Sequence, residues 1–318
     1  MKLVLLDTDT LGYDLDFKVF ERYGKVECYA YSSPEEVVER SKDATICISN
    51  KVQYTKEIID ELPKLKLICL TSTGTNTADL GYCHEKGINV CNVVNYSTES
   101  VVQLTFSMIF YLLAPLKFYD DYTKNGSYVN DVNFSHYTHT WSELSNKTIG
   151  IVGLGTIGKR VADVARAFGA KVIYYSTSGK NKNDDYDQVD FESLLSRSDI
   201  ISIHAPLTKE SNNLFNINVM KKMKKSSILV NMGRGPIVNE EDLIVALNEG
   251  YISRAGLDVL AKEPMTENHP LSKLHDKDKL YITPHVGWAS VEARNRMIDE
   301  VLRNISSFVE GDRRNVVN

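Results

Sequence analysis

Short runs of apolar, often β-branched residues alternate along the chain with segments of helical period. Several of these runs are apolar at consecutive positions, which is typical of strands covered on both faces. The pattern therefore predicts parallel sheets with helices on each side. The expected strands are residues 2–7, 26–30, 44–49, 65–73 and 88–93 in the first half, and 148–153, 171–175, 200–204, 228–231, 254–259 and 280–283 in the second.

Helix boundaries are marked by capping residues. Ser33 is followed by a proline and, three residues later, by Glu36, which predicts a helix start. Ser290 begins a second helix, whose apolar residues recur with the helical period until Gly311 ends it. The longest apolar stretch, residues 100–115, is interrupted by polar residues and is shorter than the ~20 residues that a membrane span needs. We predict a buried helix there.

Two polar segments break this alternation. Residues 117–146 are rich in Tyr, Asn, Asp, Thr and His, and we expect an exposed, irregular arm. Residues 176–188 carry several lysines and aspartates, and we expect a solvated loop. Neither segment is a repeat or a low-complexity tract.

Length and composition are those of a globular protein. At ~150 residues per domain, 318 residues suggest two domains, and 42% hydrophobic with 25% charged residues excludes collagen-like, coiled-coil and mostly disordered chains. The net charge of −5 argues against nucleic acid or an anionic membrane as a partner. The first apolar run is too short for a signal peptide. The five cysteines fit no common zinc spacing, so we expect reduced thiols, a cytoplasmic location and no metal site.

The most informative local motif is a glycine pattern after a predicted strand. Gly153, Gly155 and Gly158 form GxGxxG, followed by a predicted helix and a second strand, the context of a dinucleotide-binding fingerprint. Gly153 would make a tight turn, Gly155 would admit a pyrophosphate to the backbone, and Gly158 would let helix and strand pack closely. Thr156 and Ile157 lie just before the predicted helix, residues 159–168, whose free N–H groups at its N-terminus favour phosphate. The alternative is that the glycines serve only a tight turn.

The end of the second strand of this unit bears on the choice between NAD and NADP. A carboxylate there accepts hydrogen bonds from the ribose 2′-hydroxyl and disfavours a 2′-phosphate. Here the chain has Ser176 and further hydroxyl residues, with Lys180 close behind and no carboxylate between them. We therefore expect NAD(H) or NADP(H) as cofactor, with NADPH tolerated or preferred.

Three later segments carry reactive side chains at the ends of predicted strands. In chain order, they read Asn231-x-x-Arg234-Gly, Asp258-Val-x-x-x-Glu263-Pro and Thr283-Pro-His285. Together with the fingerprint, these motifs resemble the D-2-hydroxyacid dehydrogenase family over essentially the whole chain. The resemblance implies an NAD(P)-dependent oxidoreductase that reduces small 2-keto acids to D-2-hydroxy acids.

By this resemblance Arg234, Glu263 and His285 form the catalytic set, and the reaction explains the residue types. Arg234 offers a planar fork that matches a carboxylate. Histidine is the side chain that exchanges protons near neutral pH, so His285 is suited to donate the proton, and Glu263 would orient its ring. Each residue alone has an ordinary structural explanation. The assignment therefore depends on the motifs occurring together.

The resemblance also assigns binding residues. Thr73 and Gly74 would hold the substrate carboxylate through their N–H groups, with Lys51, Arg234 and His285 as further substrate contacts. The residues expected to bind the cofactor are Gly153, Gly155, Thr156, Ile157, Gly158, Ser176, His204, Ala205, Pro206, Thr208, Met232, Gly233, Asp258 and Gly287. In that set, Asp258 matches the residue that meets the nicotinamide carboxamide. An exposed lysine and a structural strand-end histidine are the alternatives for Lys51 and His204.

The architecture of the family is α/β and discontinuous. It has two doubly wound parallel-sheet domains, Rossmann-like and flavodoxin-like, with an active-site cleft between them. Residues 1–98 plus 285–318 would form the flavodoxin-like substrate domain, and residues 99–284 the NAD(P)-binding Rossmann domain. The arm at 117–146 resembles the family's dimerisation element, so we expect a homodimer. A self-folded polar loop is the alternative.

Several segments are most similar to those of glycerate dehydrogenases, also called hydroxypyruvate reductases. They include Asn50-Lys51, Thr73-Gly74 and Pro284-His285. Thr75 and Thr77 stand where this subgroup often has tyrosine and asparagine, which leaves the identity of the acid open. Hydroxypyruvate or glyoxylate is the preferred hypothesis. The alternatives are another acid, of D-lactate or branched type, and a non-catalytic NAD(H)-sensing scaffold similar to corepressors.

Overall fold

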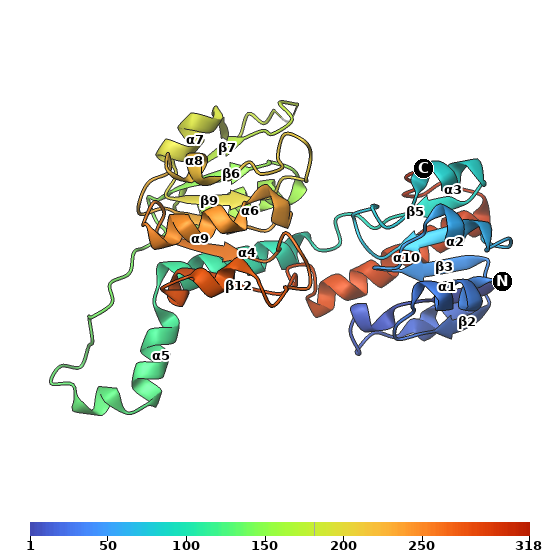
Figure 1. Cartoon of the computed structure of the whole chain (residues 1–318), viewed down its shortest axis with the longest axis horizontal. Helices are drawn as coiled ribbons and strands as arrows, with labels where there is room; N and C mark the ends of the chain where they lie inside the picture. The colour runs from blue at the N-terminus through green and yellow to red at the C-terminus, as the bar shows by residue number, and fades with distance from the viewer. Residues whose placement is uncertain (181) are drawn as a thin grey trace. The chain divides into compact units, whose positions relative to one another are not determined.

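The chain divides into two compact units. The computed structural model describes residues 1–180 and 182–318 (Figure 1). Unit 1 consists of Met1–Ser97 and Trp288–Asn318, and unit 2 of Thr98–Gly287. The chain returns from unit 2 to unit 1 at Trp288, three residues after the expected boundary at His285. Residues 285–287 stay with unit 2 because their N–H groups all bond to Asp258.

Unit 1 is built on a five-stranded parallel sheet in the order β2-β1-β3-β4-β5. Its strands are β1 (Lys2–Leu5), β2 (Lys25–Cys28), β3 (Ile46–Ser49), β4 (Leu67–Leu70) and β5 (Asn89–Cys91). This is the strand order of flavodoxin-like doubly wound sheets. Ligands of such sheets bind beyond the carboxyl ends of the strands, so the loops after β3 and β4 are candidates for a binding site.

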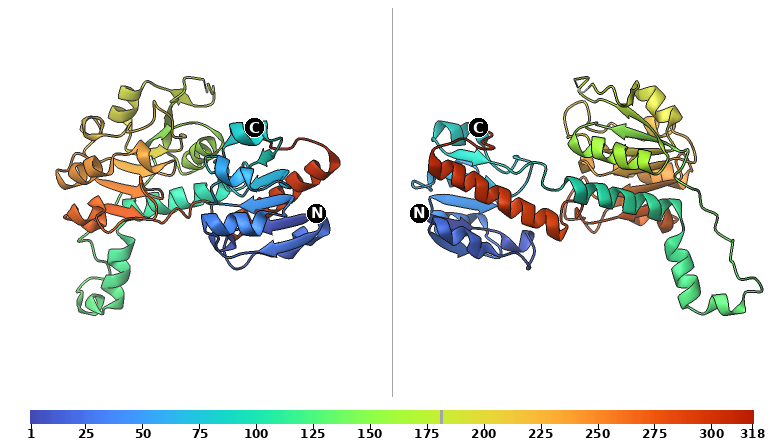
Figure 2. Two further views of the ribbon diagram at one scale, coloured as in Figure 1. Left: turned by 45° about the vertical axis from the view of Figure 1, so that its right-hand side comes forward. Right: turned by 180° about the vertical axis from the view of Figure 1, so that it is seen from behind.

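Helices cover both faces of this sheet. One core joins the sheet to α1 (Pro34–Ser41), α2 (Lys56–Asp60) and α3 (Leu80–Glu85). The other joins it to the 3₁₀ helix η2 (Phe17–Tyr23) and to α10 (Val291–Glu310), which lies along the sheet in Figure 2 (right). The capping predictions are confirmed: Ser33 and Glu36 form a capping box, Ser290 caps α10, and Gly311 ends it at φ +86°. A further 3₁₀ turn, η1, spans Thr8–Thr10.

Unit 2 is built on a seven-stranded parallel sheet in the order β12-β11-β10-β9-β6-β7-β8. Its strands are β6 (Thr148–Val152), β7 (Lys171–Tyr175), β8 (Asp187–Gln188), β9 (Ile200–Ile203), β10 (Ile228–Asn231), β11 (Arg254–Leu257) and β12 (Leu280–Ile282). The chain moves outward from β6 in one direction and then, from β9, in the other. This is the Rossmann arrangement, with its topological switch between β6 and β9.

Two helical layers sandwich this sheet. On one face lie α4 (Thr98–Leu113) and α6 (Thr156–Ala167), which Figure 2 (right) shows in front of the strands. On the other lie α7 (Phe191–Arg197), α8 (Ile217–Met220) and α9 (Glu240–Asn248). Short 3₁₀ helices follow the later strands: η4 (Gly235–Ile237), η5 (Pro270–Lys273) and η6 (Lys277–Lys279). The prediction of two doubly wound parallel-sheet domains is confirmed.

Two expectations for unit 2 were wrong in detail. The segment at 176–188, apart from Asn181, which lies outside the described residues, ends in the short strand β8 paired with β7. Two polar residues carry too little apolar pattern to predict a strand. The arm contains α5 (Leu116–Lys124) and the 3₁₀ helix η3 (Ser127–Asn130), where irregular structure was expected. Lys117–Asp121 and Lys124–Asp120 ion pairs at i,i+4 spacing support α5.

The predicted buried helix is α4. Its side chains Val102, Phe106 and Ile109 belong to the hydrophobic core between the sheet of unit 2 and the helices α4 and α6. Within the described residues, no single helix is long and apolar enough to cross a membrane. By length and composition alone, α4 and α5 taken together are long and apolar enough, but the pair is bent by 66° at its junction.

Candidate active site

The three glycines after β6 meet different surroundings. Gly153 has φ +90°, and a Cβ on it would lie 2.8 Å from the backbone of Ala205. A Cβ on Gly158 would lie 2.2 Å from the Gly153 carbonyl oxygen, so only glycine lets α6 pack this closely on the turn. A Cβ on Gly155 would meet no atom of residues 1–180 or 182–318 within 4 Å. Gly155 is therefore free of internal packing demands, and the space over it is open to a ligand.

The N-terminus of α6 presents an uncapped set of backbone donors. Gly155 is the N-cap residue and provides no side-chain hydrogen bond to the first turn. Gly155 and Thr156 are exposed, and Ile157 is half-buried. A groove of about 650 Å³ runs over this turn, and Lys159, Lys180 and Lys182 are among its lining residues. Free N–H groups at a helix N-terminus bind phosphate, and the lysines add positive charge.

Two buried polar atoms beside the glycine turn have no hydrogen-bond partner in the described part of the chain. Ser176 follows β7, and its buried Oγ has no hydrogen bond within the described residues. His204 follows β9 and bonds Ser202 Oγ through Nε2 at 2.8 Å, whereas its buried Nδ1 has no partner within the same residues. Part of His204 reaches the surface, but burial of its ring lowers its pKa to about 3. The ring is neutral at physiological pH, and both orphaned atoms suit a polar ligand across the switch point.

The remaining residues after β9 serve the turn itself. Ala205 is buried against Gly153, whereas Pro206 and Thr208 are exposed. The Thr208 hydroxyl accepts a hydrogen bond from the Ser211 N–H at 3.3 Å. Ala205 and Pro206 are thus placed beside the glycine turn, while the Thr208 side chain has a local structural partner.

The end of β10 is shaped by Asn231. This fully buried amide accepts a hydrogen bond from the Gly233 N–H and donates one to the Arg234 carbonyl, both at 3.0 Å. Met232 and Gly233 are buried, and a Cβ on Gly233 would lie 2.7 Å from the Ala205 carbonyl oxygen. The exposed Arg234 side chain donates to the Gly233 carbonyl at 2.8 Å. A rigid turn therefore presents a solvent-accessible guanidinium.

Glu263 and His285 form a hydrogen-bonded pair. His285 Nδ1 lies 2.7 Å from Glu263 Oε2, and the Leu260 N–H donates to Glu263 Oε1 at 2.9 Å. About a third of each of the two side chains is exposed. Because the carboxylate accepts the proton on Nδ1, Nε2 is the nitrogen left to exchange a proton with a ligand.

The backbone at His285 adopts the left-handed conformation, with φ +55°. Asp258 holds this turn: its carbonyl accepts the His285 N–H at 2.8 Å, and its two carboxylate oxygens accept the Val286 and Gly287 N–H groups at 2.9 Å. The Thr283 hydroxyl donates to the same carboxylate at 2.6 Å. Burial raises the pKa of the Asp258 carboxyl, and these donors oppose the rise. In this structure, therefore, Asp258 sets the orientation of His285.

Arg234, Glu263 and His285 share one edge of the sheet. They follow β10, β11 and β12, which are consecutive parallel neighbours, so all three project from the same carboxyl ends. A Cβ on Gly235 would lie 2.0 Å from the carbonyl of Leu260, which puts the segment after Arg234 directly against the loop that leads to Glu263. The fold thus gathers three residues that are far apart in the chain.

The candidate substrate residues of unit 1 also follow adjacent strands. Asp7 accepts the N–H groups of Asn50, at 3.0 Å, and Lys51, at 2.6 Å, and so fixes the loop after β3 with the Lys51 side chain exposed. Burial raises the pKa of the Asp7 carboxyl, and these donors oppose the rise. The loop after β4 is held by the Thr73 hydroxyl, which donates to the Val93 carbonyl at 2.8 Å. The backbone N–H groups of Thr73 and Gly74 donate no hydrogen bond within the described residues, so they remain open to an anion.

Comparison with known proteins gives the family. The sequence profile of the D-isomer specific 2-hydroxyacid dehydrogenase, NAD binding domain, matches residues 106–287. Hydroxypyruvate reductase of Blautia hydrogenotrophica is 35% identical over an alignment of 327 residues that covers 100% of both proteins. The chain belongs to the D-isomer-specific 2-hydroxyacid dehydrogenase family.

Solved structures with bound cofactors resemble this dehydrogenase. D-Lactate dehydrogenase from Aquifex aeolicus, in complex with NAD and lactic acid, has 30% identity and a TM-score of 0.83, covering 98% of this chain and 96% of that one. An acyclic imino acid reductase in complex with NADPH and D-Arg has 28% identity and a TM-score of 0.88 over 100% of both chains. The predicted family, activity class and cofactor type are confirmed: the protein is an NAD(P)-dependent dehydrogenase of 2-hydroxy acids.

Sequence analysis missed several polar residues that position these loops in the dehydrogenase. Asp7, described above, is one of them, whereas Asn231 was identified as a motif residue without its role in the turn. Asn92 donates to the Thr73 carbonyl at 2.9 Å, and the Ser100 hydroxyl donates to the Gly287 carbonyl at 2.6 Å. Asp7, Asn92 and Asn231 each lie at or just beyond the end of an apolar strand. A polar residue at the end of an apolar strand could have marked these positions in the sequence. That pattern does not show which loop the residue binds.

Proposed function

We propose that this dehydrogenase reduces hydroxypyruvate to D-glycerate and glyoxylate to glycolate, with Arg234, Glu263 and His285 as its catalytic residues. The observation that carries the proposal is the 2.7 Å contact between His285 Nδ1 and Glu263 Oε2, on the sheet edge that also carries Arg234. The name of the Blautia hydrogenotrophica relative supports this choice of acid.

The three residues divide the chemistry between them. Arg234 binds the carboxylate of the keto acid and stabilises the negative charge that develops on the C2 oxygen. When bound, the reduced nicotinamide supplies the hydride for C2. As the C2–O double bond opens, its electron pair takes the proton from His285 Nε2, which leaves a neutral imidazole. Glu263 keeps the other proton on Nδ1 and stabilises the charged ring before transfer.

Unit 1 supplies the other substrate contacts in this proposal. The N–H groups of Thr73 and Gly74 would donate hydrogen bonds to the substrate carboxylate, and Lys51 adds a positive charge after the neighbouring strand. These two amides donate no hydrogen bond within the described residues, Thr73 being exposed and Gly74 half-buried, and adjacent backbone N–H groups of this kind favour an anionic ligand. Unit 1 is accordingly proposed as the substrate domain, and unit 2 as the cofactor domain.

A panel of 2-keto acids with NADH and NADPH tests the substrate assignment. We expect the highest kcat/KM for hydroxypyruvate or glyoxylate. A higher value for pyruvate or a branched keto acid would contradict this choice of acid while leaving the reaction class intact. Tight NADH binding without turnover of any acid would instead favour the sensing scaffold.

We propose that the cofactor binds to unit 2, at the glycine turn after β6 and at the ends of the neighbouring strands. Gly153, Gly155, Thr156, Ile157 and Gly158 would hold the pyrophosphate. The residues after the neighbouring strands would hold the rest of the cofactor: Ser176, His204, Ala205, Pro206, Thr208, Met232, Gly233, Asp258 and Gly287. The orphaned Ser176 Oγ and His204 Nδ1, together with the open space over Gly155, support the fit of a dinucleotide.

Matched glycine substitutions separate binding from folding. Gly155→Ala should leave thermal stability unchanged, because its φ is an ordinary −79° and a Cβ would contact none of the residues that the structure describes. The same methyl group should weaken NADH binding about tenfold, equivalent to ~1.4 kcal/mol, as measured by protein fluorescence. Gly158→Ala should instead lower the free energy of unfolding by about 1–3 kcal/mol through overpacking. Wild-type NADH affinity in Gly155→Ala would contradict the proposal that the glycine turn binds the cofactor.

The polar end of β7 supports use of NADPH. Lys180 and Lys182 line the groove over α6 and have no ion-pair partner within the described residues, whereas Lys159 and Arg160 lie near Asp185 and Glu99. We expect kcat/KM for NADPH to equal or exceed that for NADH. Lys180→Glu should lower the NADPH value about five- to tenfold, because an exposed ion pair contributes ~1 kcal/mol, and should leave the NADH value unchanged.

Two controls accompany the cofactor experiment. Lys225→Glu changes an exposed lysine at the opposite end of the strands and should affect neither cofactor. The NADPH advantage should also shrink as salt is raised, because exposed charges are screened. If the wild-type enzyme rejects NADPH, the proposed preference fails.

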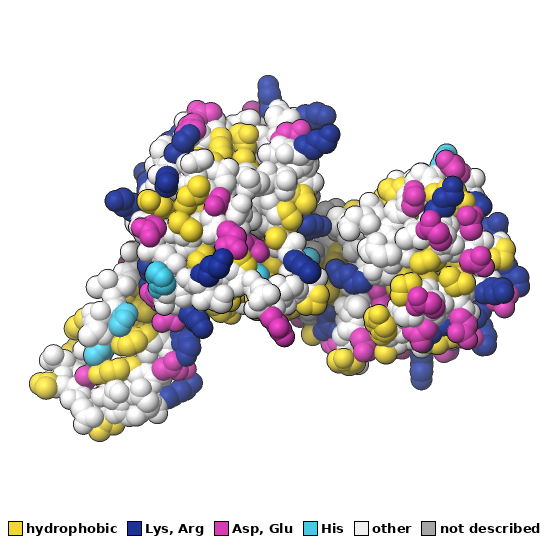
Figure 3. All heavy atoms as spheres, viewed as in Figure 1, with side chains coloured by type: hydrophobic (Ala, Val, Ile, Leu, Met, Phe, Trp, Pro, Cys, Tyr) yellow, Lys and Arg dark blue, Asp and Glu magenta, His cyan; other side chains and the backbone are white. Residues whose placement is uncertain are grey.

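We further propose that the arm makes a homodimer. Its exposed apolar side chains Val132, Phe134, Tyr137 and Trp141 favour a protein partner. Figures 1 and 3 show the arm leading away from the sheet of unit 2, with hydrophobic and histidine side chains on its surface.

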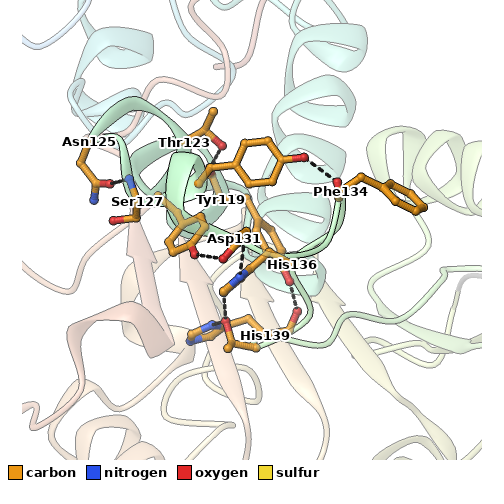
Figure 4. A network of polar contacts seen from close by, with 11 residues as sticks. Tyr119, Thr123, Asn125, Ser127, Asp131, Phe134, His136 and His139 are labelled. Carbon is orange, nitrogen blue, oxygen red and sulfur yellow. Dashed lines mark hydrogen bonds and ion pairs between the residues drawn. The ribbon is translucent and has the colours of Figure 1, made fainter.

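The arm is held in shape by an internal network (Figure 4). Asp131 accepts hydrogen bonds from Tyr122, at 2.6 Å, and from His136, at 3.1 Å, and the Tyr122 and His136 rings stack with centroids 4.0 Å apart. The Tyr119 hydroxyl donates to the His139 carbonyl. These bonds favour one conformation of the arm, so little entropy is lost when a partner binds.

A charged side chain introduced at an exposed apolar position of the arm should dissociate the dimer. We expect wild type to sediment at twice the chain mass of 35.9 kDa and Phe134→Asp at the chain mass, because a side chain now 91% exposed would be buried as a charge in the interface. Tyr13→Asp, at an 89% exposed aromatic of unit 1, should stay dimeric. A monomeric wild type at micromolar concentration would contradict the proposal and favour a self-folded arm.

We propose a cytoplasmic location. Cys69 and Cys91 are register partners on adjacent strands, and both are buried free thiols. Burial raises the pKa of Cys91 to about 11 and raises that of Cys69 well above its usual value, so these thiols are unreactive. Neighbouring cysteines left as thiols are typical of a reducing compartment. Recovery of the enzyme in an extracytoplasmic cell fraction would contradict the proposal.

A further inference from the structure

A second carboxylate lies behind the Glu263–His285 pair. Glu240 is the first residue of α9, and little of its side chain is exposed. Its Oε1 accepts the N–H of Ala261 at 2.6 Å, a contact with a residue outside its own helix. The carboxylate thus joins α9 to the loop between β11 and Glu263.

His269 braces this carboxylate from the other side. Its Nδ1 accepts the Leu271 N–H at 3.2 Å, which leaves the proton on Nε2. Nε2 lies 3.0 Å from Glu240 Oε2, at an angle too bent for a good hydrogen bond, so the contact is mainly electrostatic. Only 9% of the His269 side chain is exposed. Glu240 is therefore confined between an imidazole and a backbone amide.

The loop that Glu240 holds is the one that presents Glu263. Ala261 shares a peptide bond with Leu260, and the Leu260 N–H donates to Glu263 Oε1 at 2.9 Å. The other oxygen of Glu263 contacts His285. The Leu260 N–H belongs to the preceding peptide, which meets the 260–261 peptide at the Leu260 Cα. A shift of the 260–261 peptide would therefore displace this donor, and with it the Glu263 carboxylate, relative to the imidazole.

The same peptide packs against the segment that presents Arg234. A Cβ on Gly235 would lie 2.0 Å from the Leu260 carbonyl and 2.4 Å from the Ala261 nitrogen, so the two backbones are in direct contact. Gly235 and Glu240 belong to one short segment after β10. That segment contacts the 260–261 peptide once through its backbone and once through a carboxylate.

We propose that Glu240 is a positioning residue for the reaction, which holds the 260–261 peptide so that Glu263 meets His285 and the Arg234 segment at fixed places. The inference rests on the proposed function, because it assumes that Glu263 and His285 transfer the proton. Glu240 itself contacts neither reactant. Its effect reaches the reaction through the position of Glu263.

The test compares Glu240→Ala, Glu240→Gln and a neighbouring control. Glu240→Ala should lower kcat about 10- to 100-fold, the scale of a small misplacement of catalytic groups, with KM for the keto acid and Kd for NADH unchanged. Glu240→Gln keeps an oxygen that accepts the Ala261 N–H and should restore most of kcat. Glu241→Ala removes an exposed carboxylate that pairs with Lys273 and should resemble wild type.

A spectroscopic measurement separates positioning from general stability. The downfield proton resonance of His285 Nδ1, assigned by its absence in His285→Ala, should broaden or shift in Glu240→Ala and return in Glu240→Gln. His269→Gln removes the imidazole that contacts Glu240. It should also lower kcat without changing KM, but by less than Glu240→Ala does. If Glu240→Ala does not fold, a wild-type kcat and resonance in His269→Gln would overturn the inference.

The outcomes also separate this inference from the proposed function. Wild-type kcat and resonance in a folded Glu240→Ala, alongside an inactive His285→Ala, would overturn the positioning role alone. An active His285→Ala would overturn the proposed catalytic set whatever Glu240→Ala does. A fall in thermal stability with unchanged kcat would assign Glu240 to folding only.

Discussion

Replacing His285 with alanine is expected to lower kcat by about 10²- to 10⁴-fold, the usual contribution of a positioned acid–base group. The reason is that the imidazole held 2.7 Å from Glu263 is the proposed proton donor to the C2 oxygen. The measurement is steady-state reduction of hydroxypyruvate at saturating NADH. The Kd for NADH should change by less than about twofold, because the glycine turn that would hold the pyrophosphate follows β6, not β12, and has its own backbone donors.

Two variants show that the effect belongs to His285. His275→Ala changes an exposed histidine of the same unit and should keep the wild-type kcat. Glu263→Gln keeps a hydrogen-bonding oxygen for Nδ1 but loses the charge, so it should cause a smaller loss than His285→Ala. Turnover by His285→Ala at the wild-type rate would show that another group donates the proton.

Replacing Arg234 with lysine is expected to lower kcat/KM for the keto acid by about 100-fold. Lysine keeps the positive charge but loses the planar fork that binds a carboxylate through two parallel hydrogen bonds. Loss of one partner of a hydrogen-bonded ion pair costs about 2–5 kcal/mol, and each 1.4 kcal/mol is a factor of ten. Arg234→Met, which removes the charge as well, should show a larger loss, of about 1,000-fold.

The control for Arg234 is another exposed arginine of unit 2. Arg197 pairs with Asp187 on the surface, and Arg197→Lys should leave kcat/KM unchanged. NADH affinity should be the same in all of these variants, as measured by fluorescence. An Arg234→Lys enzyme with wild-type kcat/KM would exclude bidentate recognition of the substrate carboxylate.

The elements that sequence analysis predicted correctly share strong local patterns. Residues 228–231 and 200–204, which are mostly apolar, predict strands buried on both faces, and β10 and β9 lie there. Ser33 with Glu36, and Ser290 with Gly311, mark helix ends whose hydrogen bonds form within a few residues. β8 and α5 were missed because their stability comes from a neighbouring strand and from ion pairs on a polar surface, not from an apolar pattern.

The residues of the candidate site were also predicted, but not all of their partners. The motifs around Arg234, Glu263 and His285 select these residues in order. They do not show that Asp258 binds the turn of His285, or that Gly235 lies against Leu260. Those contacts join residues that are distant in sequence, and nothing in the spacing of the motifs specifies them.

By itself, the sequence determined the alternation of strands and helices, the glycine turn before a helix, and the family and reaction class. Each of these depends on local periodicity, on backbone freedom at single positions, or on motifs in a fixed order. Only the tertiary structure decided which strand ends are neighbours, and therefore that Arg234, Glu263 and His285 project from one sheet edge. It also decided that Glu240, an ordinary helix-start residue in sequence, lies half-buried against Ala261 and His269. The physical reason is that long-range packing and hydrogen bonding, which place such residues, are properties of the folded chain and not of any one segment.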